Sequence, residues 1–390
     1  QRWAVNRGMP LFERGPDADP EGLLYTDYRT ASRSVASLAK LASQSRPWFL
    51  ATGFVRPHLP FNAPSAFFDA AAASSAAARP CGSSGSAAEC RPPKGASPAF
   101  AAHLRDGEGE LRDFGARMAT LRPGSSRAAA LAAAYSAAAS FADAQVGRVL
   151  REGLDAHNLT ASTLVALCGD HGFKLGHGGS WGKHTLLRAD TRVPLVVAGP
   201  GVRAGVEVRV PVELLDVYPT LLRLAGLGPP RGDPRAQPRL EGRPLTPWLS
   251  GGGGGDSAPA RRGAAFALSQ WPSPRAEWPC MGYALRTANW SQVTWAPLAR
   301  THTRAGAAGR SARCGGAADL FSNAPGPGWR EARNLLAQPQ LAPRAAALRE
   351  MLRRILRRDP GDPRARGPRL AGAPRNGSLS VDRGISKGEV

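Results

Sequence analysis

The residues best suited to chemistry begin with an acidic and an imidazole side chain placed side by side. Asp170 and His171 directly follow the apolar run 163–168, and Gly169 and Gly172 flank them. A carboxylate beside an imidazole suits a divalent cation: oxygen favours Ca²⁺ or Mg²⁺, and nitrogen favours Zn²⁺ or Mn²⁺. The flanking glycines allow close backbone approach to a ligand. The alternative is that Asp170 caps the next turn and His171 is a surface residue.

Two more candidates carry positive charge or can acquire it. Lys183 lies twelve residues after His171, beyond the glycine-rich stretch 176–179. Only five of the 51 basic residues are lysines, so a lysine placed here is a candidate contact for an anion. His58 has prolines on both sides, which fix the backbone and so the direction of its side chain. The alternatives are a solvated lysine and a loop histidine bonded to backbone.

These residues need a scaffold, and the apolar pattern predicts one of alternating helices and buried strands. Such alternation is typical of an α/β fold with a mainly parallel sheet covered on both faces. Ligands of open α/β sheets bind beyond the carboxyl ends of strands, which is where Asp170 and His171 lie. The expected helices are 31–41, 127–156 and 212–227, the last interrupted at Pro219, and the expected strands are 48–54, 163–168 and 194–198.

The composition divides the chain further. Residues 1–230 are expected to form the α/β core, with a low-complexity insertion at 70–98. Residues 231–262 contain five consecutive glycines and are expected to be a linker. Residues 263–358 predict a small α+β subdomain, an antiparallel sheet with one helix. Residues 359–390 have too little apolar content to fold alone and are expected to be a disordered tail.

The net charge of +21 would suit a polyanionic partner. However, 51 − 5 = 46 of the basic residues are arginines scattered among Ala, Gly and Pro. This indicates a compositional bias, and we expect no nucleic-acid partner. The longest Ala-rich run, 128–142, is too short and too weakly apolar to cross a bilayer, so no transmembrane segment is expected.

Five cysteines leave at least one unpaired within the chain. Cys81 and Cys90 would close a short loop, Cys280 and Cys314 could link two late segments, and Cys168, in an apolar run, is expected to be a buried thiol. Three Asn-x-Ser/Thr triplets would fit a secretory route; they begin at Asn158, Asn289 and Asn376.

Several segments, in their order along the chain, resemble the sulfatase family over roughly residues 17–340, the insertion excepted. They read GFVRPHLPFNAPSAFF, ADAQVGRVL, GDHGFKLGHGGSWGKHT, TRVPLVVAGPGV and VELLDVYPTLLRLAGL. The resemblance implies an alkaline-phosphatase-like α/β sandwich with a smaller C-terminal sheet. It also implies hydrolysis of sulfate monoesters, such as those of sulfated glycans, with Ca²⁺ and a formylglycine nucleophile, in a lysosomal or secreted protein.

The resemblance gives roles to the candidate residues. Asp170 and His171 match the Asp-His pair of the metal-binding motif, although the imidazole could contact the nucleophile instead of the metal. Lys183 matches the lysine that holds a sulfate oxygen. His58 matches the histidine that contacts sulfate and protonates the departing alcohol. An imidazole with a pKa near 6.5 can donate a proton at lysosomal pH.

The sequence departs from the family in ways that bear on activity. Neither an Asp-Asp pair nor a Cys-x-Pro-x-Arg segment, whose Cys becomes formylglycine, precedes His58. The nearest lookalike is 90–94, interpreted as a loop cysteine bonded to Cys81. The family's Leu-Gly-Glu-His-Gly is Leu-Gly-His-Gly-Gly at 175–179, and its Asn-Phe-Glu is Leu-Leu-Arg at 186–188.

Three hypotheses follow from these departures. The first is that this chain is the C-terminal two-thirds of a sulfatase, inactive alone and completed by an N-terminal chain of the same protein, because the covalent step lacks an acceptor. The second is a catalytically dead sulfatase-like module that binds sulfated or acidic glycans. The third, a phosphoesterase of the alkaline phosphatase type, would need a Ser or Thr nucleophile that is equally absent.

Overall fold

The computed structural model describes most of the chain between residues 10 and 357. The described residues are 10–16, 19, 22–74, 81, 90–106, 109–114, 118–228, 240–249, 265–273, 280–297, 316–323 and 331–357. The predicted tail at 359–390 lies outside them, as does most of the predicted linker.

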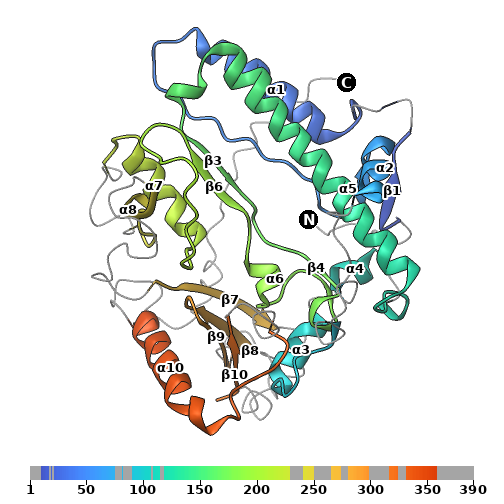
Figure 1. Ribbon diagram of the computed structural model, residues 1–390, viewed down its shortest axis with the longest axis vertical. Coiled ribbons are helices and arrows are strands. Elements are labelled where there is room, and N and C mark those ends of the chain that lie inside the picture. Colours follow the sequence, from blue (N-terminus) through green and yellow to red (C-terminus); the bar gives the residue numbers. More distant parts are fainter. Residues whose placement is uncertain are drawn as a thin grey trace, which may run out of the picture.

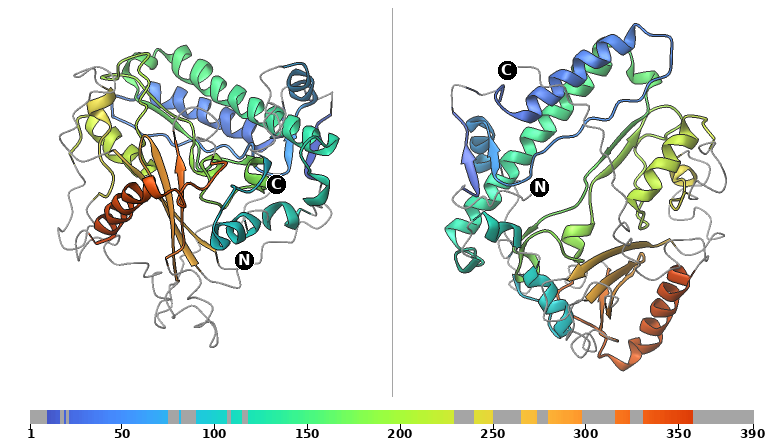
Figure 2. Two further views of the ribbon diagram at one scale, coloured as in Figure 1. Left: turned by 60° about the horizontal axis from the view of Figure 1, so that its bottom comes forward. Right: turned by 180° about the vertical axis from the view of Figure 1, so that it is seen from behind.

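Two long helices form one side of the molecule, where they lie side by side (Figures 1 and 2). Helix α1 spans Thr26–Ala42 and helix α5 spans Ser126–Arg148, so the helices predicted at 31–41 and 127–156 are confirmed. Ser125 caps α5 by accepting a hydrogen bond from the backbone N–H of Ala128. A single turn of π-helix, η3 (Val149–Leu154), follows α5 directly.

Beside α5, two short strands form a parallel pair. Strand β1 (Phe12–Arg14) pairs with β2 (Phe61–Ala63), and helix α2 (Ser65–Ala73) follows β2. The ring of Phe61 is completely buried. It contacts the rings of Tyr135 and Phe173 edge-on, with centroids 5.4 Å away in each case. This aromatic cluster fixes the position of β2, the strand that follows His58.

The strands predicted at 163–168 and 194–198 exist as β3 (Val165–Cys168) and β6 (Leu195–Ala198). They pair antiparallel, and among the described strands only β1 and β2 pair in parallel. The mixed α/β class is thus confirmed, whereas this pair does not have the parallel direction expected for most of the sheet. The reason is that the chain between them folds into a small hairpin and returns, instead of crossing over the sheet.

Residues 48–54 are extended but form no ladder with any described strand, so the prediction of a buried strand there was wrong. Phe49 is 83% exposed. The segment is instead tied to α1, where the hydroxyls of Ser34 and Thr52 lie 2.9 Å apart. Cys168 is likewise exposed, which corrects the expected buried thiol. Both predictions assumed that an apolar run is covered, and among the described residues no element covers these two.

The C-terminal part is an antiparallel sheet with one helix, as predicted (Figure 1). Its strand order is β10-β9-β8-β7, and helix α10 (Ala342–Arg357) packs on one face through Leu348, Leu352 and Ile355. The strands are β7 (Ala267–Ser273), β8 (Cys280–Arg286), β9 (Trp290–Pro297) and β10 (Ala318–Ser322).

Smaller expectations had mixed outcomes. Pro219 does not interrupt its helix: it is the third residue of α7 (Val217–Leu224), where a helix needs no backbone N–H. The predicted linker contains a short helix, α8 (Thr246–Leu249). Within the predicted insertion at 70–98, Lys94 forms a parallel bridge with Arg333. The domain boundaries themselves remain predictions.

In the described part of the chain, no helix is long and apolar enough to cross a membrane.

Candidate active site

Lys183 stands at the end of a small hairpin. Strands β4 (Lys174–Leu175) and β5 (Trp181–Gly182) pair antiparallel, and the glycine-rich turn joins them. Lys183 follows β5 directly and its side chain is only 10% exposed. The hairpin is thus the element that aims the one lysine singled out from the sequence.

A second lysine holds this hairpin from inside. The side chain of Lys174 is completely buried, and its Nζ lies 2.6 Å from Oδ2 of Asp190. The same ammonium donates to the carbonyl oxygen of Gly182 at 3.0 Å and to the hydroxyl of Thr185 at 3.2 Å. Asp190 lies in the short helix α6 (Arg188–Thr191) and also accepts from the backbone N–H of Thr185. The backbone on both sides of Lys183 is therefore bonded to one buried ion pair.

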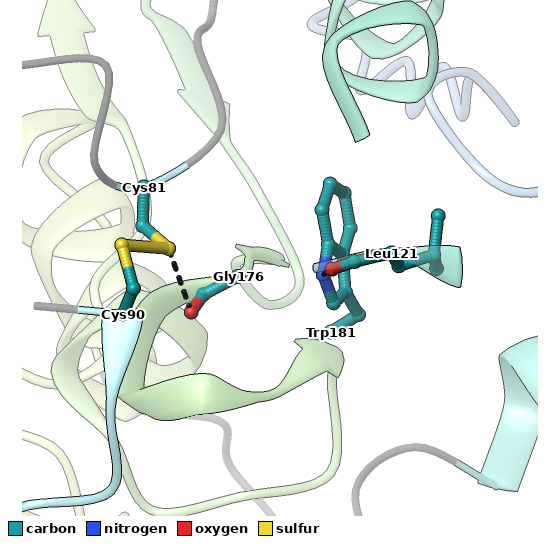
Figure 3. The surroundings of a disulfide bond; sticks show 5 residues. All are labelled: Cys81, Cys90, Leu121, Gly176 and Trp181. Atoms are coloured by element: carbon teal, nitrogen blue, oxygen red, sulfur yellow. Dashed lines mark hydrogen bonds between the residues drawn. A yellow bond between two sulfur atoms is a disulfide. The ribbon is translucent and has the colours of Figure 1, made fainter. Parts of the chain in front are cut away.

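The Cys81–Cys90 disulfide, predicted from the sequence, forms beside the turn (Figure 3). The backbone N–H of Cys81 donates to Leu175, and its Sγ lies 3.0 Å from the carbonyl oxygen of Gly176. Gly176 has φ +95°, and a Cβ there would lie 2.8 Å from that sulfur. The sulfur of Cys81 thus packs against a turn position that only glycine fits. Cys280 is also disulfide-bonded, and its expected partner, Cys314, lies outside the described residues.

Leu186 and Leu187, at the position where the sequence departs from the family, are buried in the core of the C-terminal sheet with Trp295. The backbone N–H of Leu186 donates to Nε2 of His103, in helix α3 (Pro98–Asp106). Arg286 of β8 donates to the carbonyl oxygen of Leu186. Leu186 and Leu187 therefore join the segment that carries Lys183 to the C-terminal sheet.

His58 is presented by a loop between the extended segment and β2. Both peptide bonds that precede its neighbouring prolines are cis. The carboxylate of Asp27, in α1, accepts the backbone N–H groups of Val55 and Arg56 and so anchors the start of the loop. Nδ1 of His58 lies 2.7 Å from the carbonyl oxygen of Leu59. The ring is 44% exposed, with Nε2 directed at a second side chain.

That second side chain is Glu110, in the short helix α4 (Gly109–Asp113), which sequence reasoning did not single out. Its Oε1 lies 3.1 Å from Nε2 of His58 and 3.0 Å from Nζ of Lys183. Residues 58 and 183, which are 125 positions apart in sequence, therefore converge on one oxygen atom. The structure brings together the two candidate residues predicted to contact an anion.

The charges of the three groups stabilise one another. Burial would raise the pKa of Glu110, but the hydrogen bonds and charges of His58 and Lys183 outweigh it and lower that pKa to about 2. The hydrogen bond to Glu110 raises the pKa of His58, against burial and the nearby charge of Lys183. The imidazole is thus held toward its charged form, with Nε2 carrying a proton.

An aromatic stack borders this group of charges. The ring of His184, next to Lys183, lies on the indole of Trp271 from β7, with centroids 4.9 Å apart and planes 11° apart. Burial lowers the pKa of His184, Glu110 raises it, and the charges of Lys183 and His171 lower it further. His171 is therefore within electrostatic range of the same imidazole.

Asp170 and His171 lie at the end of β3, where the sequence placed them, but at the surface. The Asp170 side chain is 87% exposed and accepts the backbone N–H of His171. Nδ1 of His171 lies 2.9 Å from the carbonyl oxygen of Gly172. The described residues contain no group of three His, Cys, Asp or Glu side chains able to hold a metal ion. Because Ca²⁺ takes six to eight oxygen ligands, this pair fits as part of a metal site and not as a whole one.

Two residues of the site, Glu110 and Lys174, had no role in the sequence analysis. Lys174 carried a usable signal, because lysine is rare in this chain and the argument applied to Lys183 applies equally to it. Glu110 carried none: it belongs to a five-residue helix that no periodic pattern marks.

A known protein family matches a large part of this chain. The family model described as Sulfatase matches residues 14–227, which is more than half of the chain. The chain belongs to the sulfatase family. This confirms the family resemblance that the motifs indicated, and with it the alkaline-phosphatase-like fold.

Individual relatives sharpen the comparison. A sulfatase of Formosa agariphila is 34% identical over 190 residues, covering 47% of this chain and 33% of the relative. Human iduronate 2-sulfatase is 27% identical over 348 residues, covering 72% and 60%. Among solved structures, a phosphonate monoester hydrolase from Silicibacter pomeroyi is 25% identical with a TM-score of 0.63, covering 92% of this chain and 66% of that one. The chain thus spans between a third and three-fifths of the length of these curated relatives.

Proposed function

We propose that this chain is the C-terminal two-thirds of a sulfuric ester hydrolase of the iduronate-2-sulfatase type, which cleaves sulfate monoesters of glycans. The observation that carries the proposal is the convergence of His58 Nε2 and Lys183 Nζ within 3.1 Å of one oxygen atom. Two cationic donors aimed at one point suit a tetrahedral anion. The likeness to human iduronate 2-sulfatase over 72% of the chain supports this substrate class.

The roles follow from the chemistry of each group. Lys183, held by the buried hairpin, would offset the negative charge of the sulfate and keep it oriented. His58, protonated on Nε2, would donate a proton to the departing alcohol oxygen as the S–O bond breaks. A raised pKa suits an acid that must be protonated before that step.

We further propose that Asp170 and His171 supply part of a Ca²⁺ site, with His171 also near the reacting group. When bound, the ion would add positive charge beside the sulfate. The remaining ligands would come from a segment of the whole protein that carries the family's Asp-Asp pair. Isothermal titration of this chain with Ca²⁺ should show no binding tighter than about 1 mM, and an N-terminal chain with that pair should restore it.

The nucleophile is the missing part. The 390 residues contain no Cys-x-Pro-x-Arg segment, and the nearest lookalike is a cysteine committed to a disulfide. We therefore expect no turnover of a fluorogenic sulfate ester by this chain alone, and turnover once an N-terminal chain bearing formylglycine is added. Turnover by the chain alone that Lys183→Met abolishes would contradict this account.

The second hypothesis, a catalytically dead module that holds sulfated or acidic glycans, has its support in the net charge of +21 and the absent nucleophile. The two differ in one result. If the transcript upstream of Gln1 encodes no Cys-x-Pro-x-Arg in frame, the binding module replaces the hydrolase. A phosphatase-type activity, prompted by the phosphonate monoester hydrolase, is checked by substituting a phosphate ester in the complemented assay.

We propose a lysosomal or secreted location for the protein. The disulfide between Cys81 and Cys90 supports an oxidising compartment. Asn158 and Asn289, which begin two of the three sequons, are both exposed; the third sequon lies outside the described residues. A glycosidase that removes N-linked glycans should increase the gel mobility of the protein expressed in a secretory host.

A further inference from the structure

Glu110 occupies the position that the proposed function gives to the substrate. Its Oε1 takes both donors, Nε2 of His58 at 3.1 Å and Nζ of Lys183 at 3.0 Å. A carboxylate oxygen and a sulfate oxygen are alike in charge and in the hydrogen bonds that they accept. No described residue other than Glu110 forms an ion pair with either donor in this structure.

Nε2 of His58 cannot donate a hydrogen bond to Glu110 and to a sulfate ester at the same time. Nδ1 of the ring is engaged by the carbonyl oxygen of Leu59, so Nε2 is the nitrogen left to serve a ligand. An imidazole nitrogen has one N–H and can donate it to one acceptor at a time. While Nε2 donates to Glu110, it cannot donate to a sulfate ester oxygen. Lys183, with three N–H groups, could serve both.

Glu110 is also incompletely bonded. Its side chain is only 15% exposed, and its second oxygen, Oε2, is buried without a hydrogen-bond partner among the described residues. A buried acceptor without a donor destabilises this arrangement. Moving the carboxylate outward would therefore cost less than moving a fully bonded one.

We propose that Glu110 is an internal counter-ion of the anion site: it binds His58 and Lys183 in the ligand-free protein, and an incoming sulfate group displaces it from His58. This inference rests on the proposed function, since it takes His58 and Lys183 as the sulfate donors. It makes Glu110 a determinant of affinity that opposes binding. It also keeps His58 protonated until the substrate takes over the contact.

The test uses the full chain and sodium sulfate as the probe, with sodium chloride holding ionic strength constant because salt screens exposed charges. Binding is followed by the ¹⁵N and ¹H shifts of the histidine rings. Glu110→Gln should bind sulfate at least about tenfold more tightly than the natural protein. Glu110→Asp, one methylene shorter, should lie between the two. Glu152→Gln, which removes an exposed carboxylate paired with Arg148, should bind as the natural protein does.

The possible results separate this inference from the proposed function. Equal or weaker sulfate binding by both Glu110 variants, in proteins with natural circular dichroism, overturns the counter-ion. If that happens while Lys183→Met still abolishes binding, the anion site stands and only the inference falls. If Lys183→Met binds sulfate as the natural protein does, the proposed site is wrong. Tighter binding by Glu110→Gln that also depends on Lys183 supports both.

Discussion

Nζ of Lys174 lies 2.6 Å from Oδ2 of Asp190, and neither side chain is more than 4% exposed. This pair is the support of the site, because the backbone around Lys183 bonds to both partners. Lys183, the cation that would face the proposed substrate, is therefore positioned by Lys174, a second cation that would not contact the substrate.

Removing one partner of this pair should be costly. Lys174→Met would leave the carboxylate of Asp190 buried without its counter-ion, and we expect a loss of about 3–5 kcal/mol of unfolding free energy. Urea denaturation measures it. Glu207→Gln, which breaks an exposed pair with Arg209, is the control and should change stability by less than about 0.5 kcal/mol. A loss below about 1 kcal/mol for Lys174→Met would show that the pair does not support the fold.

His103 should make stability depend on pH. It is completely buried, accepts from the backbone N–H of Leu186, and burial lowers its pKa to about 3. Between pH 6.5 and 3 the unfolded chain binds a proton at this histidine that the folded chain does not. Stability therefore rises with pH in this window and is lost as pH falls below about 6.5, at up to about 1.4 kcal/mol per pH unit.

His103→Gln, whose amide oxygen can accept the same hydrogen bond, is the variant that tests this. Denaturation curves taken at several pH values give the unfolding free energy as a function of pH. Between pH 5 and 6.5, the slope of that dependence should be smaller in the variant by the contribution of one proton. An unchanged slope would mean that His103 is protonated in the folded protein, or that its surroundings open to water.

Glu110 should control the protonation of His58. In the natural protein the pKa of His58 lies above its ordinary value of 6.5, chiefly because of the hydrogen bond to Glu110. In Glu110→Gln that pKa should fall, since burial and the charge of Lys183 both lower it. The ring resonances of His58, followed against pH by NMR, measure the change, and those of His157, which has no role in the site, should not shift between the two proteins. If the pKa of His58 is the same in both proteins, Glu110 does not control the protonation of His58.

The glycine turn should not tolerate a side chain. Gly176→Ala introduces a Cβ 2.8 Å from Sγ of Cys81 at φ +95°, whereas Gly205→Ala, at φ +72°, meets nothing within 4 Å. The second variant carries only the backbone strain of a left-handed alanine, about 1–2 kcal/mol. The first should lose measurably more in thermal or urea unfolding, because it must also displace the disulfide. Equal losses would indicate that the Cys81 side chain moves aside at no cost in stability.

The sequence was most informative where short motifs fix local chemistry. Lys183 could be proposed from the glycine-rich loop and the rarity of lysine, and His58 from its flanking prolines together with the family resemblance. The structure places both beside Glu110. Glu110 could not, because its role arises only from where a five-residue helix packs. The run at 48–54 was extended as its composition suggests, but a strand also needs a neighbour, and composition does not say whether one is present. Leu186 and Leu187 depart from the family's motif shortly after Lys183, and the structure buries both side chains in the core with Trp295.

Those two leucines bear on how the protein can be divided. Their side chains complete the core beneath the C-terminal sheet, and Gly282 of β8 has no room for a Cβ because Leu186 lies 2.6 Å from where one would be. A truncation after residue 262 would expose both leucines to water. It would also remove the contacts that hold the segment carrying Lys183 to the C-terminal sheet. Although composition suggests a boundary there, the smallest portion of this chain that keeps the proposed anion site should extend through α10. The two halves should unfold in one cooperative transition.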